Sequence, residues 1–308
     1  MATVPAIDLG SAQAASHLDR ACREVGFFTV AGHGVPAALL DRLDAAARAV
    51  FAQPDDVKAS YAMARAGKAW RGWVPVGGEL TSGVPDRKEG LYFGSEDDPD
   101  DPRPLHGANL FPPGLREPVL AWMAAMTDLG QQVLDLLGGA LGLGTGWFRT
   151  HLTGDPVTLF RIFHYPPQAG GSDGWGVAEH TDYGLLTLLA QDGTSGLQVR
   201  AADGAWLDVP PDRDVLVCNL GDMLEKLTGG RYRSTPHRVR NEAGRGRLSF
   251  PFFLDPSWDA VCRPLPLAGA PPADDAGRRW DGTSVRAWDG VYGDYLTAKV
   301  AKVFPLLG

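Results

Sequence analysis

The chain has 308 residues, of which 44% are hydrophobic and 21% charged, the balance of an ordinary globular protein. Its 29 Lys and Arg against 37 Asp and Glu give a net charge of −8, which argues against a nucleic-acid partner and favours a small-molecule substrate. No apolar run approaches the roughly 20 residues that span a bilayer, and the N-terminus lacks a signal-peptide pattern. The 3 cysteines are too few for a disulfide framework. We therefore expect a cytoplasmic protein that does not bind membranes, and the sequence leaves its oligomeric state open.

Two helices and a long loop are predicted in the first third of the chain. Ser11 can cap a helix over residues 11–24, and Pro36 can begin a second over residues 36–51. Residues 94–113 are rich in Asp, Pro and Gly and predict a surface loop, with the acidic run at 96–101 interpreted as solvated. Residues 1–115 are thus expected to form a helical N-terminal region.

The clearest helix is predicted to begin near Leu115. Apolar residues recur there at three- and four-residue steps, the spacing of a helix that packs one face on a core. They are Val119, Trp122, Met123, Met126, Leu129, Val133, Leu136 and Leu137. The Gly-rich residues 138–142 are predicted to end this helix.

From residue 157 onwards, short apolar runs separated by turns predict β-strands. The expected strands cover residues 157–165, 184–191, 197–201, 206–209, 215–220, 237–239 and 248–254, with a turn at 221–225. This spacing, and the 39 Gly and 24 Pro of the chain, are typical of a sandwich or a double-sheet jelly roll. A final helix over residues 284–303 is expected to pack back on the sheet. We predict a mainly β fold with flanking helices, its core at about 150–260, in a single domain spanning 1–308.

The segment His180-Thr-Asp182 is the first candidate for chemistry. Side chains at i and i+2 of a strand share a face, so His180 and Asp182 can offer an imidazole and a carboxylate to one metal ion. A His-x-Asp pair alone arises easily by chance. His237, several strands later, is a third candidate ligand. Two histidines and one carboxylate on one side of an iron ion are typical of non-haem Fe(II) oxygenases and leave three coordination positions open.

A second motif, Arg247-Leu-Ser249, follows His237 by ten positions. On a strand, Arg247 and Ser249 again share a face. A guanidinium with a neighbouring hydroxyl suits a carboxylate, because bidentate charge-assisted hydrogen bonds are strong and directional. The motif therefore predicts a carboxylate site near the metal.

Together these motifs resemble the signature of the isopenicillin N synthase-like family of Fe(II)/2-oxoglutarate-dependent dioxygenases. The resemblance extends through most of the chain. Residues 4–9 are similar to the family's first strand, residues 21–36 to its N-terminal signature, and residues 71–79, 86–89 and 220–225 to its bacterial members. It implies a double-stranded β-helix, the jelly-roll core predicted above, with Fe(II) in its mouth held by His180, Asp182 and His237.

The resemblance also implies a site for 2-oxoglutarate. Arg247 and Ser249 are expected to bind its C5 carboxylate while the other end chelates the iron. Tyr165 lies where many members place a hydroxyl near that carboxylate. Those members often carry an Asn two positions earlier, where this chain has Phe163, so the hydrogen bonding around the cosubstrate is expected to differ.

The implied reaction consumes O₂ and 2-oxoglutarate, releases succinate and CO₂, and oxidises a C–H bond of a small molecule, with hydroxylation as the default outcome. No catalytic residue is expected beyond the iron centre. Arg161, Tyr183, Trp73 and Phe252 are the candidate substrate contacts, chosen from their neighbourhood in the sequence. The substrate itself is not specified, since one fold serves many ligands in this family; specialised metabolism such as antibiotic biosynthesis is the expected setting.

Three alternatives remain open. A same-fold oxidase would take all electrons from its substrate without 2-oxoglutarate, and the Arg247 motif does not exclude it. Tyr183-Gly184 and Arg161 also resemble the bacterial ethylene-forming branch, in which 2-oxoglutarate itself is fragmented. A jelly-roll binding protein with a vestigial iron site is the alternative from outside the enzymes.

Overall fold

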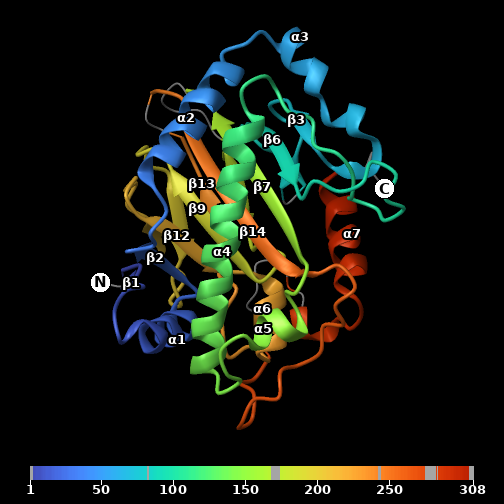
Figure 1. Ribbon diagram of the computed structural model, residues 1–308. Coiled ribbons are helices and arrows are strands. Elements are labelled where there is room, and N and C mark those ends of the chain that lie inside the picture. The colour runs from blue at the N-terminus through green and yellow to red at the C-terminus, as the bar shows by residue number, and fades with distance from the viewer. Residues whose placement is uncertain are drawn as a thin grey trace.

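The computed structural model describes residues 3–81, 83–167, 174–241, 244–274, 282 and 284–304, and its strands form two main sheets (Figure 1). The eight-stranded sheet has the order β1 (Ala6–Asp8), β2 (Phe27–Ala31), β12 (Leu216–Leu220), β9 (Leu186–Gln191), β14 (Arg247–Ser257), β7 (Pro156–Tyr165), β6 (Glu89–Gly94) and β3 (Gly72–Val74). The four-stranded sheet has the order β11 (Trp206–Asp208), β10 (Leu197–Arg200), β13 (His237–Val239) and β8 (Val177–His180). The short strands β4 (Leu80–Thr81) and β5 (Val84–Pro85) form a separate hairpin. The predicted mainly β fold with flanking helices is confirmed.

All seven predicted strands are present, with three differences from the prediction in this part of the chain. The strand expected from residue 184 begins at Leu186, because the Gly184 backbone instead accepts a hydrogen bond from Met223 N. Strand β8 was not predicted as such, and it ends at His180, so Asp182 lies in the connector that follows. The expected turn at residues 221–225 is the short helix α6 (Asp222–Leu227).

The N-terminal region is less helical than predicted. It supplies β1 and β2 at one edge of the large sheet and β6 and β3 at the other. Its helices are α1 (Ala14–Glu24), α2 (Ala37–Phe51) and the short α3 (Asp55–Lys58), followed by the 3-10 turns η1 (Ala59–Tyr61) and η2 (Met63–Ala69). Helix α1 begins after residue 11, because the Ser11 hydroxyl accepts a hydrogen bond from Gln13 N in a preceding turn. The single domain stays a prediction.

Helix α4 (Arg116–Ala140) lies across the outer face of the large sheet (Figure 1). The predicted apolar stripe is its buried face, and it packs on β7, β9 and β14. At Gly130 an added Cβ would lie 2.9 Å from Leu254 of β14, which shows how closely helix and sheet approach. The helix continues through Gly138 and ends at Ala140, followed by the short α5 (Trp147–His151).

Strand alternation on β14 separates the packing face from the functional face. Leu248, Phe250, Phe252 and Leu254 belong to the core shared with α4, whereas the residues between them line a cavity on the other face. A smaller core joins the two sheets on that side, with Phe27, Leu189 and Val217 from the large sheet against Val177, Leu197, Val199 and Val239 from the small one. The cavity therefore lies between the sheets, as a jelly roll permits.

The C-terminal helix α7 (Tyr292–Val303) begins later than the predicted residue 284. Ser284 caps the 3-10 turn η4 (Val285–Ala287) instead, and Gly290, at φ +149°, interrupts any helix between them. Helix α7 lies beside the sheets (Figure 1), packs Leu296 and Val300 into the core, and contributes to the lining of the cavity. Within the described residues, no helix has both the length and the apolar character to cross a membrane.

Candidate metal centre

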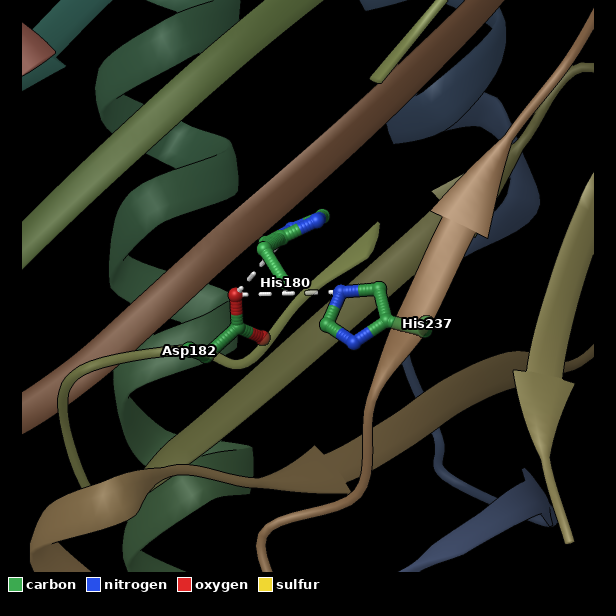
Figure 2. A group of neighbouring side chains, drawn as sticks. All are labelled: His180, Asp182 and His237. Carbon is green, nitrogen blue, oxygen red and sulfur yellow. Dashed lines mark ion pairs between the residues drawn. The ribbon is translucent and has the colours of Figure 1, made fainter. Parts of the chain in front are cut away.

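The structure brings His180, Asp182 and His237 together (Figure 2). His180 ends β8 and His237 begins β13, and the two residues are paired directly across these strands. Asp182 reaches the same point from the connector after β8. One ligand atom from each residue lies within 4.8 Å of the others, with Asp182 Oδ1 3.9 Å from His180 Nε2 and 3.8 Å from His237 Nε2. A metal ion with bonds of about 2.0–2.2 Å needs only small shifts to join them.

Both imidazoles present the same nitrogen to this point. Nδ1 of His180 lies 2.8 Å from the Ala178 carbonyl oxygen, and Nδ1 of His237 lies 3.3 Å from that of Thr235. A carbonyl oxygen only accepts, so each Nδ1 must carry the proton. The Nε2 lone pairs are thus left for a metal, the arrangement by which backbone partners orient metal-binding histidines.

Asp182 is held by two donors on the large sheet. Its Oδ2 accepts hydrogen bonds from Thr187 Oγ1 at 2.5 Å and Asn219 Nδ2 at 2.6 Å. Only Oδ1 then faces the histidines. The carboxylate is fixed as a ligand with one free oxygen.

The electrostatics of Asp182 and His237 favour the forms of these two residues that bind a metal. Burial acts to raise the pKa of Asp182, but His237, His180 and the two hydrogen bonds outweigh it and lower the pKa below its ordinary value. Burial, with the adjacent His180, lowers the pKa of His237. Near neutral pH the carboxylate is therefore ionised and the buried imidazole of His237 is neutral, as metal ligation requires.

These residues open on a cavity of about 470 Å³ between the sheets. Its wall includes both motifs predicted from the sequence, since Tyr165, Arg247 and Ser249 line it beside the metal ligands. Strand pairing explains their proximity, because Arg247 is the direct neighbour of Tyr165 across β14 and β7.

Arg247 is fully buried and lacks a complete set of partners. Its Nε donates to the Thr194 carbonyl at 3.2 Å and its Nη2 to Gln191 Oε1 at 3.4 Å. Within the described part of the chain, Nη1 has no hydrogen-bond acceptor. A buried guanidinium with an unsatisfied donor is costly unless a ligand supplies the acceptor. Arg247 thus fits the carboxylate of 2-oxoglutarate.

Tyr165 and Ser249 complete this end of the cavity. Their hydroxyl oxygens lie 3.5 Å apart, and the Arg247 guanidinium lies 4.9 Å from the centre of the Tyr165 ring. Asn241 donates to the backbone carbonyls of Tyr165 and Pro166, which fixes the strand end from which the tyrosine projects. Two hydroxyl groups and one guanidinium therefore surround the same space.

The four candidate substrate contacts fall into two groups. Arg161 and Tyr183 line the cavity. Trp73 and Phe252 do not, so their expected position at the pocket is wrong. Phe252 lies on the α4 face of β14 because side chains alternate along a strand, and Trp73 donates its indole N–H to Glu89 in the core between β3 and β6.

Several residues at the site were missed from the sequence. They are the Asp182 partners Thr187 and Asn219, the Arg247 partners Gln191 and Thr194, and the cavity residues Trp70, Glu79, Lys88 and Asp255. A polar residue within a buried apolar strand, such as Asn219 in Leu216–Leu220, was the available signal.

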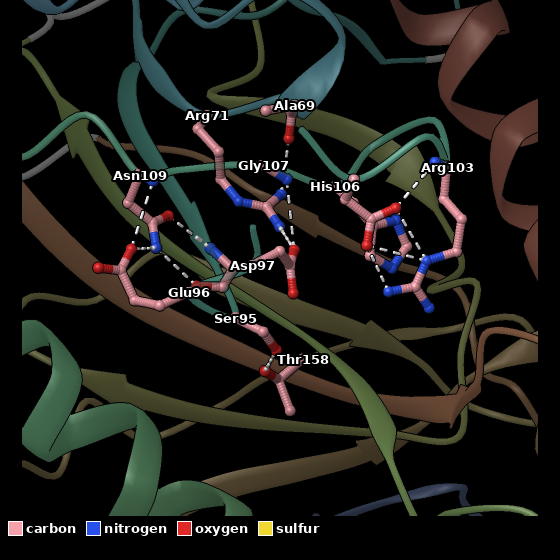
Figure 3. A network of polar contacts seen from close by, with 12 residues as sticks. Ala69, Arg71, Ser95, Glu96, Asp97, Arg103, His106, Gly107, Asn109 and Thr158 are labelled. Carbon is pink, nitrogen blue, oxygen red and sulfur yellow. Dashed lines mark hydrogen bonds and ion pairs between the residues drawn. The ribbon is translucent and has the colours of Figure 1, made fainter. Parts of the chain in front are cut away.

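The acidic loop at residues 94–113 is irregular, as predicted, but it is not simply solvated (Figure 3). Glu96 accepts hydrogen bonds from Asn109 and Arg116, and Asp97 lies 3.7 Å from the Arg71 guanidinium. These contacts tie the loop to the first residue of α4 and to Arg71, just before β3. They occupy the carboxylates with protein cations and amides.

The fold and the donor set are those of the non-haem iron oxygenases, and comparison with known proteins agrees. Residues 156–256 match the profile of the 2OG-Fe(II) oxygenase superfamily. Residues 4–114 match the N-terminal profile of non-haem dioxygenases in morphine synthesis. A protein of Dictyostelium discoideum named a probable iron/ascorbate oxidoreductase is 42% identical, over 94% of this chain and 88% of that protein. The chain belongs to the 2OG-Fe(II) oxygenase superfamily, whose cofactor is Fe(II) and whose cosubstrates are 2-oxoglutarate and O₂.

Two further relatives extend the comparison. The 2-oxoglutarate-dependent dioxygenase citB of Monascus ruber is 38% identical, over 85% of this chain and 82% of its own. A full-length Neurospora crassa protein in complex with alpha-KG superimposes with a TM-score of 0.82 at 22% identity, covering 97% of this chain and 96% of that one. The same protein has been solved with alpha-KG and thymine, at a TM-score of 0.81. At this identity the structural likeness establishes the fold.

Proposed function

We propose that this enzyme hydroxylates a C–H bond of a small molecule, with His180, Asp182 and His237 holding Fe(II) and Arg247 binding 2-oxoglutarate. The unsatisfied Nη1 donor of Arg247, in the cavity that the three ligands share, is the observation that carries the proposal. A site that binds only a metal ion has no use for this donor, whereas a site that also binds the carboxylate of 2-oxoglutarate does.

Each residue has one task in this proposal. Bound Fe(II) supplies the activation of O₂, coupled to decarboxylation of 2-oxoglutarate to succinate and CO₂. Asp182 contributes the one negative charge among the ligands, and Thr187 and Asn219 keep its second oxygen occupied. Arg247 binds the C5 carboxylate with Ser249, and the Tyr165 hydroxyl lies beside it.

The remaining cavity wall serves to orient the substrate and exclude water. Leu159, Phe163, Phe253, Leu296 and Val300 give it a largely apolar surface. Positioning of one C–H bond towards the metal decides whether hydroxylation or another oxidation follows, since reactivity depends steeply on orientation.

The decisive experiment measures iron binding and succinate release in wild type, His180→Ala and the control His151→Ala. His151 is an exposed histidine on α5, away from the cavity. We expect His180→Ala to lose stoichiometric Fe(II) binding and succinate release, while His151→Ala retains both. Full activity of His180→Ala would refute the ligand assignment.

The same assay separates the alternatives. Substrate oxidation that proceeds fully without 2-oxoglutarate would favour a same-fold oxidase, and ethylene in the headspace would favour the ethylene-forming reaction. A protein that consumes no O₂ with Fe(II), 2-oxoglutarate and candidate substrates would be a binding protein.

Finer assignments belong to the same proposal. Membership of the isopenicillin N synthase-like family is supported by the order of the His180, His237 and Arg247 motifs, and a bacterial type by residues 71–79 and 86–89. A cytoplasmic location, a single domain and a role in specialised metabolism such as antibiotic biosynthesis are also proposed, the first supported by the buried free cysteines.

A further inference from the structure

Arg161 is a buried cation in the cavity wall that neither the metal site nor the cosubstrate site uses. It lies on β7, four residues before Tyr165, so both side chains project from the same face of the strand. At roughly 3.3 Å per residue the two positions are about 13 Å apart. Arg161 is only 3% exposed. The cavity thus has a second guanidinium, well separated from Arg247.

Most hydrogen-bond donors of Arg161 have no acceptor in the part of the chain that the structure describes. Arginine carries five N–H donors, and here both protein hydrogen bonds come from Nη1, to the carbonyls of Phe93 and Phe160 at 3.0 Å each. Across the described residues, no carboxylate lies within ion-pair distance of Arg161, and Nε and Nη2 have no acceptor. Burial lowers the pKa of Arg161 to about 9, which still leaves it charged near neutral pH.

Lys88, another buried cation that lines the cavity, differs from Arg161 because carboxylates neutralise its charge. Its ammonium contacts the carboxylates of both Glu79 and Asp86. When all three are ionised, this group carries one net negative charge, which stabilises Arg161 from a distance but fills none of its donors. Arg71, the buried arginine near the acidic loop, has Asp97 at 3.7 Å (Figure 3).

Trp70 gives a second observation at the same place. Its ring centre lies 4.2 Å from the Arg161 guanidinium carbon, and the Tyr92 ring lies at 4.4 Å. The Trp70 indole N–H is buried and, within the residues described, has no acceptor. Trp70 also has φ +54°, a left-handed conformation that is costly for a bulky residue, at the end of the 3-10 turn η2.

We propose that Arg161, with Trp70 beside it, binds a carboxylate of the oxidised substrate, so that the substrate is a small organic acid with a largely apolar body. The planar guanidinium edge matches a carboxylate bidentately. The largely apolar wall of the cavity suits a hydrocarbon body, and a volume of about 470 Å³ that must also hold 2-oxoglutarate limits its size. This inference rests on the proposed function.

The test compares acids with uncharged analogues on the Fe(II)-loaded, 2-oxoglutarate-bound enzyme under anaerobic conditions. The probes are acetate, hexanoate, benzoate, phenylacetate and indole-3-acetate, each against its primary amide. Binding is measured as the rise in melting temperature, and aerobic succinate release is measured in parallel. We expect at least one acid to stabilise the wild type and stimulate succinate release while its amide does neither.

Substitutions test whether Arg161 is responsible for the binding of acids. Arg161→Gln is expected to weaken acid binding by 10- to 100-fold while changing the Kd of 2-oxoglutarate less than twofold, which also shows that the variant is folded. Arg161→Lys is expected to be intermediate, because it keeps the charge and loses the fork. Lys302→Met removes an exposed cation at the cavity edge and is the matched control for a general effect of charge. It is expected to change acid binding less than threefold.

The outcomes separate this inference from the proposed function. If the wild type binds no 2-oxoglutarate or releases no succinate, the proposed function fails. If 2-oxoglutarate binds and turns over but no acid of the series binds at millimolar concentration, or amides bind as well as acids, only the role of Arg161 is wrong. Equal losses in Arg161→Gln and Lys302→Met would also contradict it.

Discussion

Replacing Arg247 by Leu should weaken the binding of 2-oxoglutarate strongly and leave the binding of a keto acid without the C5 carboxylate nearly unchanged. The guanidinium is fully buried, and Nη1 is the donor left free by Thr194 and Gln191. A bidentate pair consists of two charge-assisted hydrogen bonds of about 1.5–3 kcal/mol each. The expected loss is about 3–6 kcal/mol, or a rise in Kd of about 10²- to 10⁴-fold.

The assay is titration calorimetry of the anaerobic Fe(II)-loaded protein with two ligands. One is 2-oxoglutarate, and the other is 2-oxopentanoate, which replaces the C5 carboxylate by a methyl group and keeps the keto-acid end. In the wild type, 2-oxoglutarate should bind much more tightly. In Arg247→Leu the two affinities should converge, because the lost interaction involves only the C5 carboxylate. Arg161→Gln is the control and should keep the wild-type preference.

Two results would refute this reasoning. Equal weakening of both ligands would mean that Arg247 maintains the shape of the cavity and does not recognise the carboxylate. An unchanged preference for 2-oxoglutarate would mean that another group binds it. Thermal unfolding of the metal-free variant shows separately how much stability depends on the contacts with Thr194 and Gln191.

Two further predictions concern the support of the site and its dependence on pH. Asn219→Leu removes one of the two donors to Asp182 Oδ2 and should weaken Fe(II) affinity by about 10- to 100-fold in a metal titration, whereas an unchanged affinity would show that Thr187 suffices. Burial raises the pKa of Asp255 to about 7, despite the hydrogen bond from Tyr292, so the folded protein retains a proton that the unfolded chain releases above about pH 4. The unfolding free energy of the metal-free wild type should therefore fall, relative to Asp255→Asn, by about 2–3 kcal/mol between pH 5 and pH 8 in urea titrations. A difference that is constant with pH would contradict a shifted Asp255.

The sequence predicted those parts of the fold that depend on local pattern. The stripe of α4 and the short apolar runs of β7, β9 and β14 were visible because their period matches a helix or a strand. Strands β1 and β6 in the N-terminal region did not stand out by periodicity. Strand β1 is an edge strand with only Ile7 buried, β6 is buried between β7 and β3, and both pair with strands that lie elsewhere in the chain.

The same distinction applies to the candidate site. The candidate metal ligands and Arg247 stand out in the sequence because they form ordered motifs with chemically demanding residue types. Their supports do not, because Asn219 and Gln191 acquire their roles only through strand pairing. Pairing of β12 with β9 places Asn219 beside Thr187, the other donor to Asp182, and pairing of β9 with β14 places Gln191 opposite Ser249, near Arg247. Phe252 was wrongly expected at the cavity. Its neighbours on β14 face the cavity, and a one-residue shift along a strand exchanges the cavity face for the core face.

Phe163, which stands where many members of the family carry an Asn, lies between the two proposed carboxylate sites at Arg247 and Arg161. It lies on β7 between Arg161 and Tyr165 and lines the same cavity, its ring 5.8 Å from that of Tyr92 and 6.4 Å from that of Tyr165. An Asn at this position would add a polar group between the two arginines. The phenyl ring instead separates the Arg247 end from the Arg161 end with an apolar surface. In the proposed arrangement, two carboxylates share one small cavity and each pairs with its own guanidinium, near strand positions about 13 Å apart.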